Sequence, residues 1–120
     1  MKCQPEAARA GIVVDLAEVA RELHADADAS SVGHAARTVL REPDLRVVVI
    51  AMRAGATIAE HHASDTATVH VLHGRLQVRL GDRVVELGAD HLLPIERGLA
   101  HEVVAIGASA FVLTLARSAA

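Results

Sequence analysis

Histidine is the residue type with the widest chemical potential in this chain. The sequence of 120 residues contains 8 histidines, and most of them follow Gly55. Those after Gly55 are His61, His62, His70, His73, His91 and His101. Imidazole is the commonest metal ligand in proteins and the side chain that titrates nearest to neutral pH. His73 precedes a glycine turn and His91 follows one, so we expect both to be solvated. The other four are candidates for a metal or ligand site.

Composition excludes several other functions. Lys and Arg total 12 against 15 for Asp and Glu, which argues against nucleic acid as a partner because phosphate binding needs clustered basic charge. Phe111 is the only Phe, Tyr or Trp side chain, so one chain cannot build a base-stacking platform or an aromatic cage. Cys3 is the only cysteine, which excludes an intrachain disulfide and a thiolate metal site within one chain.

The sequence contains no segment suited to a membrane. The longest uninterrupted apolar run is Val47–Met52, far below the ~20 residues that a membrane span needs. The first residues, MKCQPEAARA, lack the continuous apolar stretch of a signal peptide. We therefore expect a cytoplasmic protein with no membrane partner.

The hydrophobic pattern predicts one helix followed by many short strands. Apolar residues at helical spacing predict a helix over residues 15–27, with Asp15 as its N-cap. After Gly33 the period becomes two, and turn residues separate strands predicted at residues 34–41, 45–53, 67–73, 75–80, 84–87, 91–95, 100–106 and 110–115. Short, evenly spaced strands without a second helix indicate an antiparallel sandwich or barrel. We expect one compact domain, with a tail and helix over residues 1–33 and a β-barrel over residues 34–120.

Three segments carry a pattern known from one protein superfamily. They read GATIAEHHA at residues 55–63, VLHGRLQV at 71–78 and GADHLLPIERGLAH at 88–101. Together they resemble the two cupin motifs, G-x5-HxH-x3/4-E-x6-G and G-x5-PxG-x2-H-x3-N. The ending SAFVLT, residues 109–114, is similar to the last strand of one group of small bacterial cupins. The resemblance covers about residues 35–115 and implies an all-β double-stranded β-helix, a jelly-roll barrel, that holds a divalent metal on three histidines and one glutamate.

The sequence departs from these motifs at several positions. Counted back from Gly74, the position of the ligand glutamate falls on Ala67, which cannot bind a metal. Glu96 stands where the second motif has proline, and Ala105 stands where it has asparagine. His101 matches the histidine of the second motif and is therefore the ligand that the resemblance implies most directly.

The first motif leaves two possible ligand sets. The shorter family spacing selects His61 and the longer selects His62, and alternation along a strand puts Glu60 and His62 on one face and His61 on the other. If Glu60 and His62 face inward, they and His101 form a two-histidine, one-carboxylate set suited to Fe(II), Mn(II) or Zn(II). If His61 faces inward, it pairs with His101, and His70 is the nearest candidate for a third ligand. Related small cupins have a histidine at the position of His61, which favours the second set.

The resemblance implies that the barrel binds a small molecule beside a divalent metal, which would be Fe, Mn, Ni or Zn, held by His61 or His62 together with His101. The implied activity is that of a metal-dependent oxygenase or isomerase, in which His70 or Glu60 could serve as a base.

The alternative is a metal-free, non-enzymatic module that binds or senses a small ligand, and Ala67 favours it. The predicted strand at residues 45–53 is apolar on both faces, so its outer face packs either under the predicted helix or against a second subunit. Because small cupins commonly dimerise, a homodimer is also expected.

Overall fold

The computed structural model describes residues 10–62 and 64–117, apart from the side chains of Glu60, His61 and His62. Within these residues the chain forms α1 (Leu16–Ala29), β1 (His34–Arg41), β2 (Leu45–Met52), β3 (Thr57–His62), β4 (Ala67–His73), β5 (Arg75–Leu80), β6 (Arg83–Gly88), β7 (Leu92–Ile95), β8 (Ala100–Ala105) and β9 (Ser109–Ala116). The hydrophobic pattern predicts all of these strands except β3.

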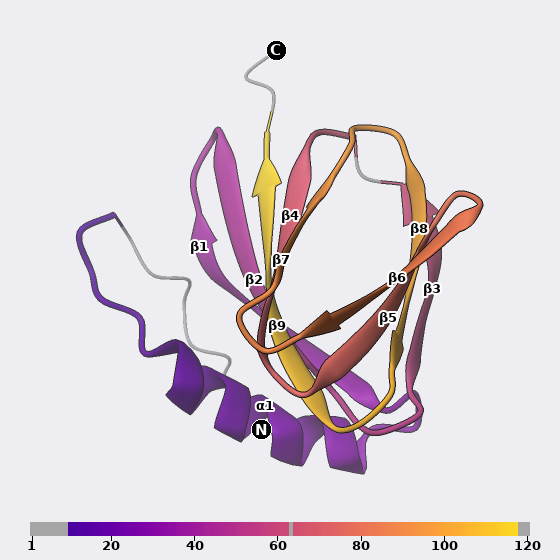
Figure 1. The fold of residues 1–120 in the computed structure, drawn as a ribbon. Helices are drawn as coiled ribbons and strands as arrows, with labels where there is room; N and C mark the ends of the chain where they lie inside the picture. The colour runs from indigo at the N-terminus through magenta and orange to yellow at the C-terminus, as the bar shows by residue number, and fades with distance from the viewer. Residues whose placement is uncertain (1–9, 63, 118–120) are drawn as a thin grey trace.

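The strands form two antiparallel sheets that face each other (Figure 1). One sheet has the order β1-β2-β9-β4-β7 and the other has the order β3-β8-β5-β6. Neighbouring strands are rarely consecutive in sequence, because the chain repeatedly crosses from one sheet to the other, as in a jelly roll. The predicted double-stranded β-helix with an N-terminal helix is confirmed.

Helix α1 lies outside the barrel (Figure 1). It begins where the Asp15 carboxylate accepts a hydrogen bond of 3.1 Å from the backbone N–H of Glu18, the N-cap expected from the sequence. Its apolar face packs on the outer face of the five-stranded sheet through Ala20, Leu23 and Ala27. Among the described residues, no helix has the length and apolar character that crossing a bilayer requires.

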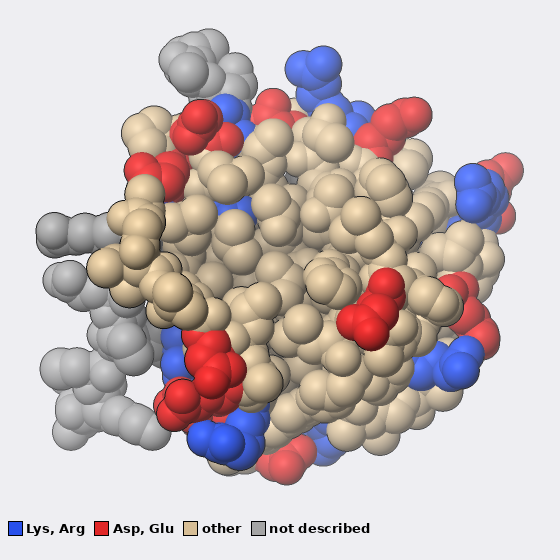
Figure 2. Space-filling model, turned by 60° about the vertical axis from the view of Figure 1, so that its left-hand side comes forward, with Lys and Arg blue, Asp and Glu red and all other residues tan. Residues whose placement is uncertain are grey.

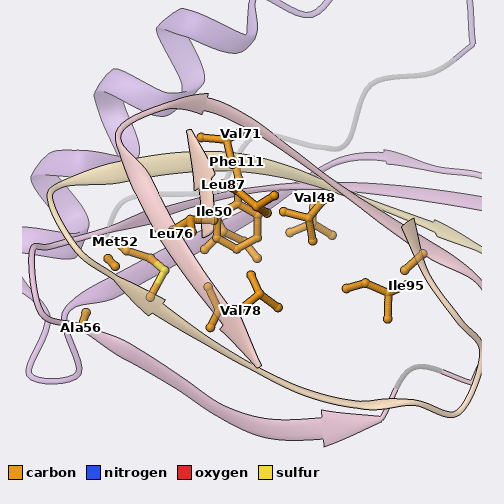
Figure 3. Packing of buried hydrophobic residues seen from close by; sticks show 14 of the residues in the cluster. Val48, Ile50, Met52, Ala56, Val71, Leu76, Val78, Leu87, Ile95 and Phe111 are labelled. Carbon is orange, nitrogen blue, oxygen red and sulfur yellow. The ribbon is translucent and has the colours of Figure 1, made fainter. Parts of the chain in front are cut away.

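Aliphatic side chains around one aromatic ring form a hydrophobic core between the sheets. Phe111 of β9 is 2% exposed and lies in the middle of this cluster (Figure 3). The same cluster includes Val48, Ile50 and Met52 of β2 and, from the opposite sheet, Leu76 and Val78 of β5. Alternate residues of each strand therefore face the barrel interior, so that any polar residue in that series is a candidate for function.

The β4–β5 turn and the start of β9 approach each other unusually closely. Gly74 has φ +89°, and a Cβ placed there would overlap Ser109 Oγ and the carbonyl oxygen of Ala108. Ser109 is fully buried, and its Oγ accepts a hydrogen bond of 2.9 Å from the Arg75 N–H. The same hydroxyl lies within donating distance of the carbonyl oxygens of Gly107 and Arg75, at 2.8 and 3.1 Å. The motif glycine at position 74 is thus required by this contact between the two sheets.

Candidate functional site

Several strand ends meet at the end of the barrel that lies away from α1 in Figure 1. Strand β2 begins there beside the end of β9, and Ala67 at the start of β4 pairs with both Leu115 and Ile95. The β7–β8 turn leads from Ile95 to the start of β8, which carries His101. We call this region the His101 end of the barrel.

His101 is a buried polar residue on the inner face of the barrel. It is 3% exposed and lies on the same face of β8 as Val103 and Ala105, which follow at every second position and belong to the core. Its ring Nδ1 lies 3.3 Å from the carbonyl oxygen of Leu99. A carbonyl oxygen can only accept a hydrogen bond, so Nδ1 is the donor in this contact, and in the neutral ring Nε2 would then carry the lone pair. A metal-binding histidine commonly has such a second hydrogen bond, which fixes the tautomer and the ring orientation.

A β-bulge sets the register between β3 and β8. Ile58 pairs with Val103, and His61 pairs with His101, so three steps along β3 match two steps along β8. Directly paired residues of antiparallel strands share one face of the sheet. The backbone therefore puts the positions of Ile58 and His61 on the same face, which uninterrupted alternation would not do.

The side chains of Glu60, His61 and His62 lie outside the described residues. Among the side chains that the structure does describe, no three His, Cys, Asp or Glu residues lie close enough to hold a metal ion. The metal centre formed by His101 with one of the two neighbouring histidines, or with Glu60, therefore stays a prediction.

His70 lies on the other face of β4 from the barrel interior. Its neighbours Val69 and Val71 are buried in the core, whereas the His70 side chain is 45% exposed and its Nε2 lies 3.8 Å from Asp90 Oδ1. The strand alternates regularly here, so the structure does not bring His70 together with His101. This placement does not support the expectation of a third ligand, base or pocket residue at position 70.

Sequence reasoning missed a charged residue on the inner face at the His101 end. Arg46 pairs with Leu115, which packs against the core, and it precedes the core residue Val48 by two positions. Its guanidinium donates a hydrogen bond of 3.2 Å from Nη2 to Thr38 Oγ1. Its Nε is buried and has no hydrogen-bond partner among the residues that the structure describes. The signal was present in the sequence, since the period of two that buries Val48 also turns Arg46 inward.

A second histidine pair lies outside the barrel, between α1 and the end of β4. The Nε2 atoms of His24 and His73 are 2.8 Å apart. The pair borders a cavity of about 380 Å³ whose lining also includes Ala17, Ala20, Arg21 and Leu72. Burial lowers the pKa of His24 below its ordinary value of 6.5, His73 lowers it further through its charge, and Asp28 acts in the opposite direction.

Comparison with known proteins gives a family match and a common fold. A family model described as a cupin domain matches residues 47–116, more than half of the chain. No match to a curated protein was found.

Solved structures with the same fold come from several organisms. A conserved protein of unknown function from Streptococcus pyogenes has a TM-score of 0.73 at 18% identity, over 92% of this chain and 90% of that one. KdgF from Halomonas sp. has a TM-score of 0.66 at 20% identity, over 72% and 82% of the two chains. Salicylate 1,2-dioxygenase from Pseudaminobacter salicylatoxidans has a TM-score of 0.73 at 15% identity, over 81% of this chain and 32% of that one. At these identities the likeness concerns the fold alone.

Proposed function

The chain belongs to the cupin domain family. We propose that it binds a small molecule inside the barrel, at the His101 end, beside a divalent metal. The main support for this proposal is the buried His101, whose Nδ1 lies 3.3 Å from the Leu99 carbonyl oxygen, a contact that suits a protonated Nδ1. A neutral imidazole in this tautomer has its lone pair on Nε2, the state in which histidine binds a metal.

The register of β3 and β8 supports His61 as the second ligand. The two histidine positions are directly paired across neighbouring strands, and the bulge favours His61 over the set that combines Glu60 with His62. Imidazole ligands suit Fe, Ni and Zn, and the open positions that a two-histidine site leaves also admit Mn. A metal held there would supply a Lewis acid that polarises an oxygen atom of the bound molecule. We propose oxygenase or isomerase chemistry as the resulting activity, a class consistent with the dioxygenase that shares this fold.

One observation favours a second function, a metal-free module that binds a small ligand. Ala67 occupies the position of the family's ligand carboxylate, and it is 1% exposed within the apolar core. With an alanine there, the donor set is reduced to histidines, and the buried His101 would then serve as a hydrogen-bonding group for the ligand. Metal content distinguishes the two functions.

The experiment is elemental analysis of untagged protein that is purified without chelator and without a metal-affinity column. We expect near-stoichiometric iron, manganese, nickel or zinc in the wild type, lost in His101→Ala and in His61→Ala. His70→Ala is the matched control and should keep its metal, because His70 lies on the outer face of β4. A circular dichroism spectrum of each variant verifies that it is folded. A wild type that holds no metal after incubation with all four ions would refute the metal site and leave the ligand-binding module.

A further inference from the structure

Two arginines face each other at the His101 end without a negative partner. Arg41, the last residue of β1, pairs directly with Arg46 of β2, so both lie on the same side of the sheet. Like charges at directly opposed positions destabilise a strand pair. The ion pairs among the described side chains involve neither arginine. Glu42 and Asp44 lie in the turn between them, and neither takes part in the ion pairs found among the described side chains.

Arg46 also carries a donor without an acceptor. Its Nη2 donates a hydrogen bond of 3.2 Å to Thr38 Oγ1, but its Nε is fully buried, and no described residue accepts a hydrogen bond from it. A guanidinium is always protonated, and it can offer Nε–H and an Nη–H as a parallel pair to two oxygens of one anion. Leaving a buried donor of a charged group unsatisfied is costly. The residue therefore lacks both an acceptor and a counter-charge.

The position of Arg46 makes it part of the ligand site rather than of the outer surface. The inner face of β2 continues from Val48, Ile50 and Met52 in the core to Arg46 at the end of the barrel. Thr38, which orients the guanidinium, pairs with Val48 and so lies on the same inner face. His101 occupies the same end of the barrel, on the opposing sheet.

We propose that Arg46, with Arg41 beside it, binds an anionic oxygen group, a carboxylate or a phosphate, on the molecule that occupies the barrel. This inference rests on the proposed function, since it assumes that a ligand enters at the His101 end. An anion would supply the missing charge beside the two arginines, and its oxygens could accept from the guanidinium once a local movement uncovers Nε, which is buried in this structure. A water molecule would satisfy the donor but not the charge.

The test measures thermal unfolding and calorimetric binding with acetate, malonate, benzoate and inorganic phosphate, at an ionic strength held constant with chloride. Benzamide is the neutral counterpart of benzoate. We expect at least one of the anions to raise the Tm of the wild type, and benzamide to leave it unchanged. A response to carboxylates alone or to phosphate alone identifies the group on the ligand. If none of the anions exceeds chloride, the proposal is overturned.

Variants at position 46 decide which residue is responsible. Arg46→Met should weaken the anion affinity about tenfold or more, as expected from loss of hydrogen bonds to a charged group. Arg46→Lys should keep part of it, because it retains the charge but loses the paired donors. Arg83→Met removes an exposed arginine of β6 and should bind like the wild type. Equal anion affinity in Arg46→Met and the wild type would overturn the proposal.

Stability without ligand provides a second and independent measurement. If Arg46 serves the ligand, Arg46→Met should be at least as stable as the wild type in chloride alone, because it removes an unsatisfied donor and a like-charge pair. A lower Tm in that buffer would assign the residue a structural role instead. Metal content in the same samples separates this inference from the proposed metal site. An anion response in a protein that takes up none of the four metal ions would refute the metal site and leave the arginine site, whereas metal uptake without an anion response would do the reverse.

Discussion

Gly74→Ala would force a side chain into the contact between the β4–β5 turn and the start of β9. The added Cβ would overlap Ser109 Oγ and the Ala108 carbonyl oxygen, and it would lie 2.6 Å from Ser109 Cα. Two of these three atoms belong to the backbone, so they cannot rotate away as the end of a flexible side chain could. The turn or the strand must move, and the hydrogen bonds of Ser109 to Arg75 are then disturbed.

Gly55→Ala is the matched control that separates this overlap from backbone strain. Gly55 has φ +82° and Gly74 has φ +89°, but a Cβ at position 55 would meet no atom within 4 Å. A left-handed conformation costs an alanine about 1–2 kcal/mol. Overpacking adds about 1–3 kcal/mol at position 74 only. We therefore expect a loss of about 1–2 kcal/mol in Gly55→Ala and about 2–5 kcal/mol in Gly74→Ala, against a total stability of about 5–15 kcal/mol for an ordinary domain.

Urea unfolding followed by circular dichroism measures both losses. The chain has no Trp and no Tyr, so intrinsic fluorescence is of little use. With equal slopes, the difference between the two transition midpoints gives the free energy of the overlap alone. Losses that agree within about 0.5 kcal/mol would refute the reasoning, because the turn would then accommodate the new methyl group without cost.

Two further predictions concern acidity and assembly. The lowered pKa of His24 means that the unfolded chain takes up this proton more readily, so stability should be full above pH 6.5 and should fall as the pH drops through that value. The charged or titratable groups around His24 are His73, Asp28 and Arg21. Urea transition midpoints of the wild type and of His24→Gln, each at pH 8 and pH 5.5, measure this loss of stability. The same pH dependence in both proteins would contradict the prediction. We also predict a homodimer, because the side of the molecule on which β1 lies has a broad face with few charged side chains (Figure 2). Light scattering should give twice the chain mass of 12.6 kDa, and the mass of one chain would contradict the prediction.

Most of the strands and the helix could be predicted because each follows a regular hydrophobic period. Asp15 is the N-cap, as predicted, and the strands β1, β4 and β5 begin and end at the predicted residues. Strand β3, Thr57–His62, was not predicted because it contains one large aliphatic residue and a bulge that breaks the alternation. An extra residue shifts the phase of the alternation, so a search for an uninterrupted period of two does not find the strand.

The candidate site was predictable in part, for a different reason. His101 could be found because a histidine at a fixed distance from a glycine carries the family motif. His70 could not be placed from sequence, since its face depends on whether β4 contains a bulge, and the structure shows regular alternation over Val69–Val71. Arg46 was hidden within a strand judged by its apolar residues, although its spacing from Val48 already put it on the inner face.

The bulge in β3 also affects how this strand can change during evolution. Three steps from Ile58 to His61 match two steps along β8, so the strand holds one residue more than the ladder needs. Loss of one residue between them would straighten the strand and still leave the same two histidine positions opposed. A lineage can therefore gain or lose a codon at Ala59 or Glu60 while position 61 remains opposite His101. Related chains that differ in length here can thus present one and the same pair.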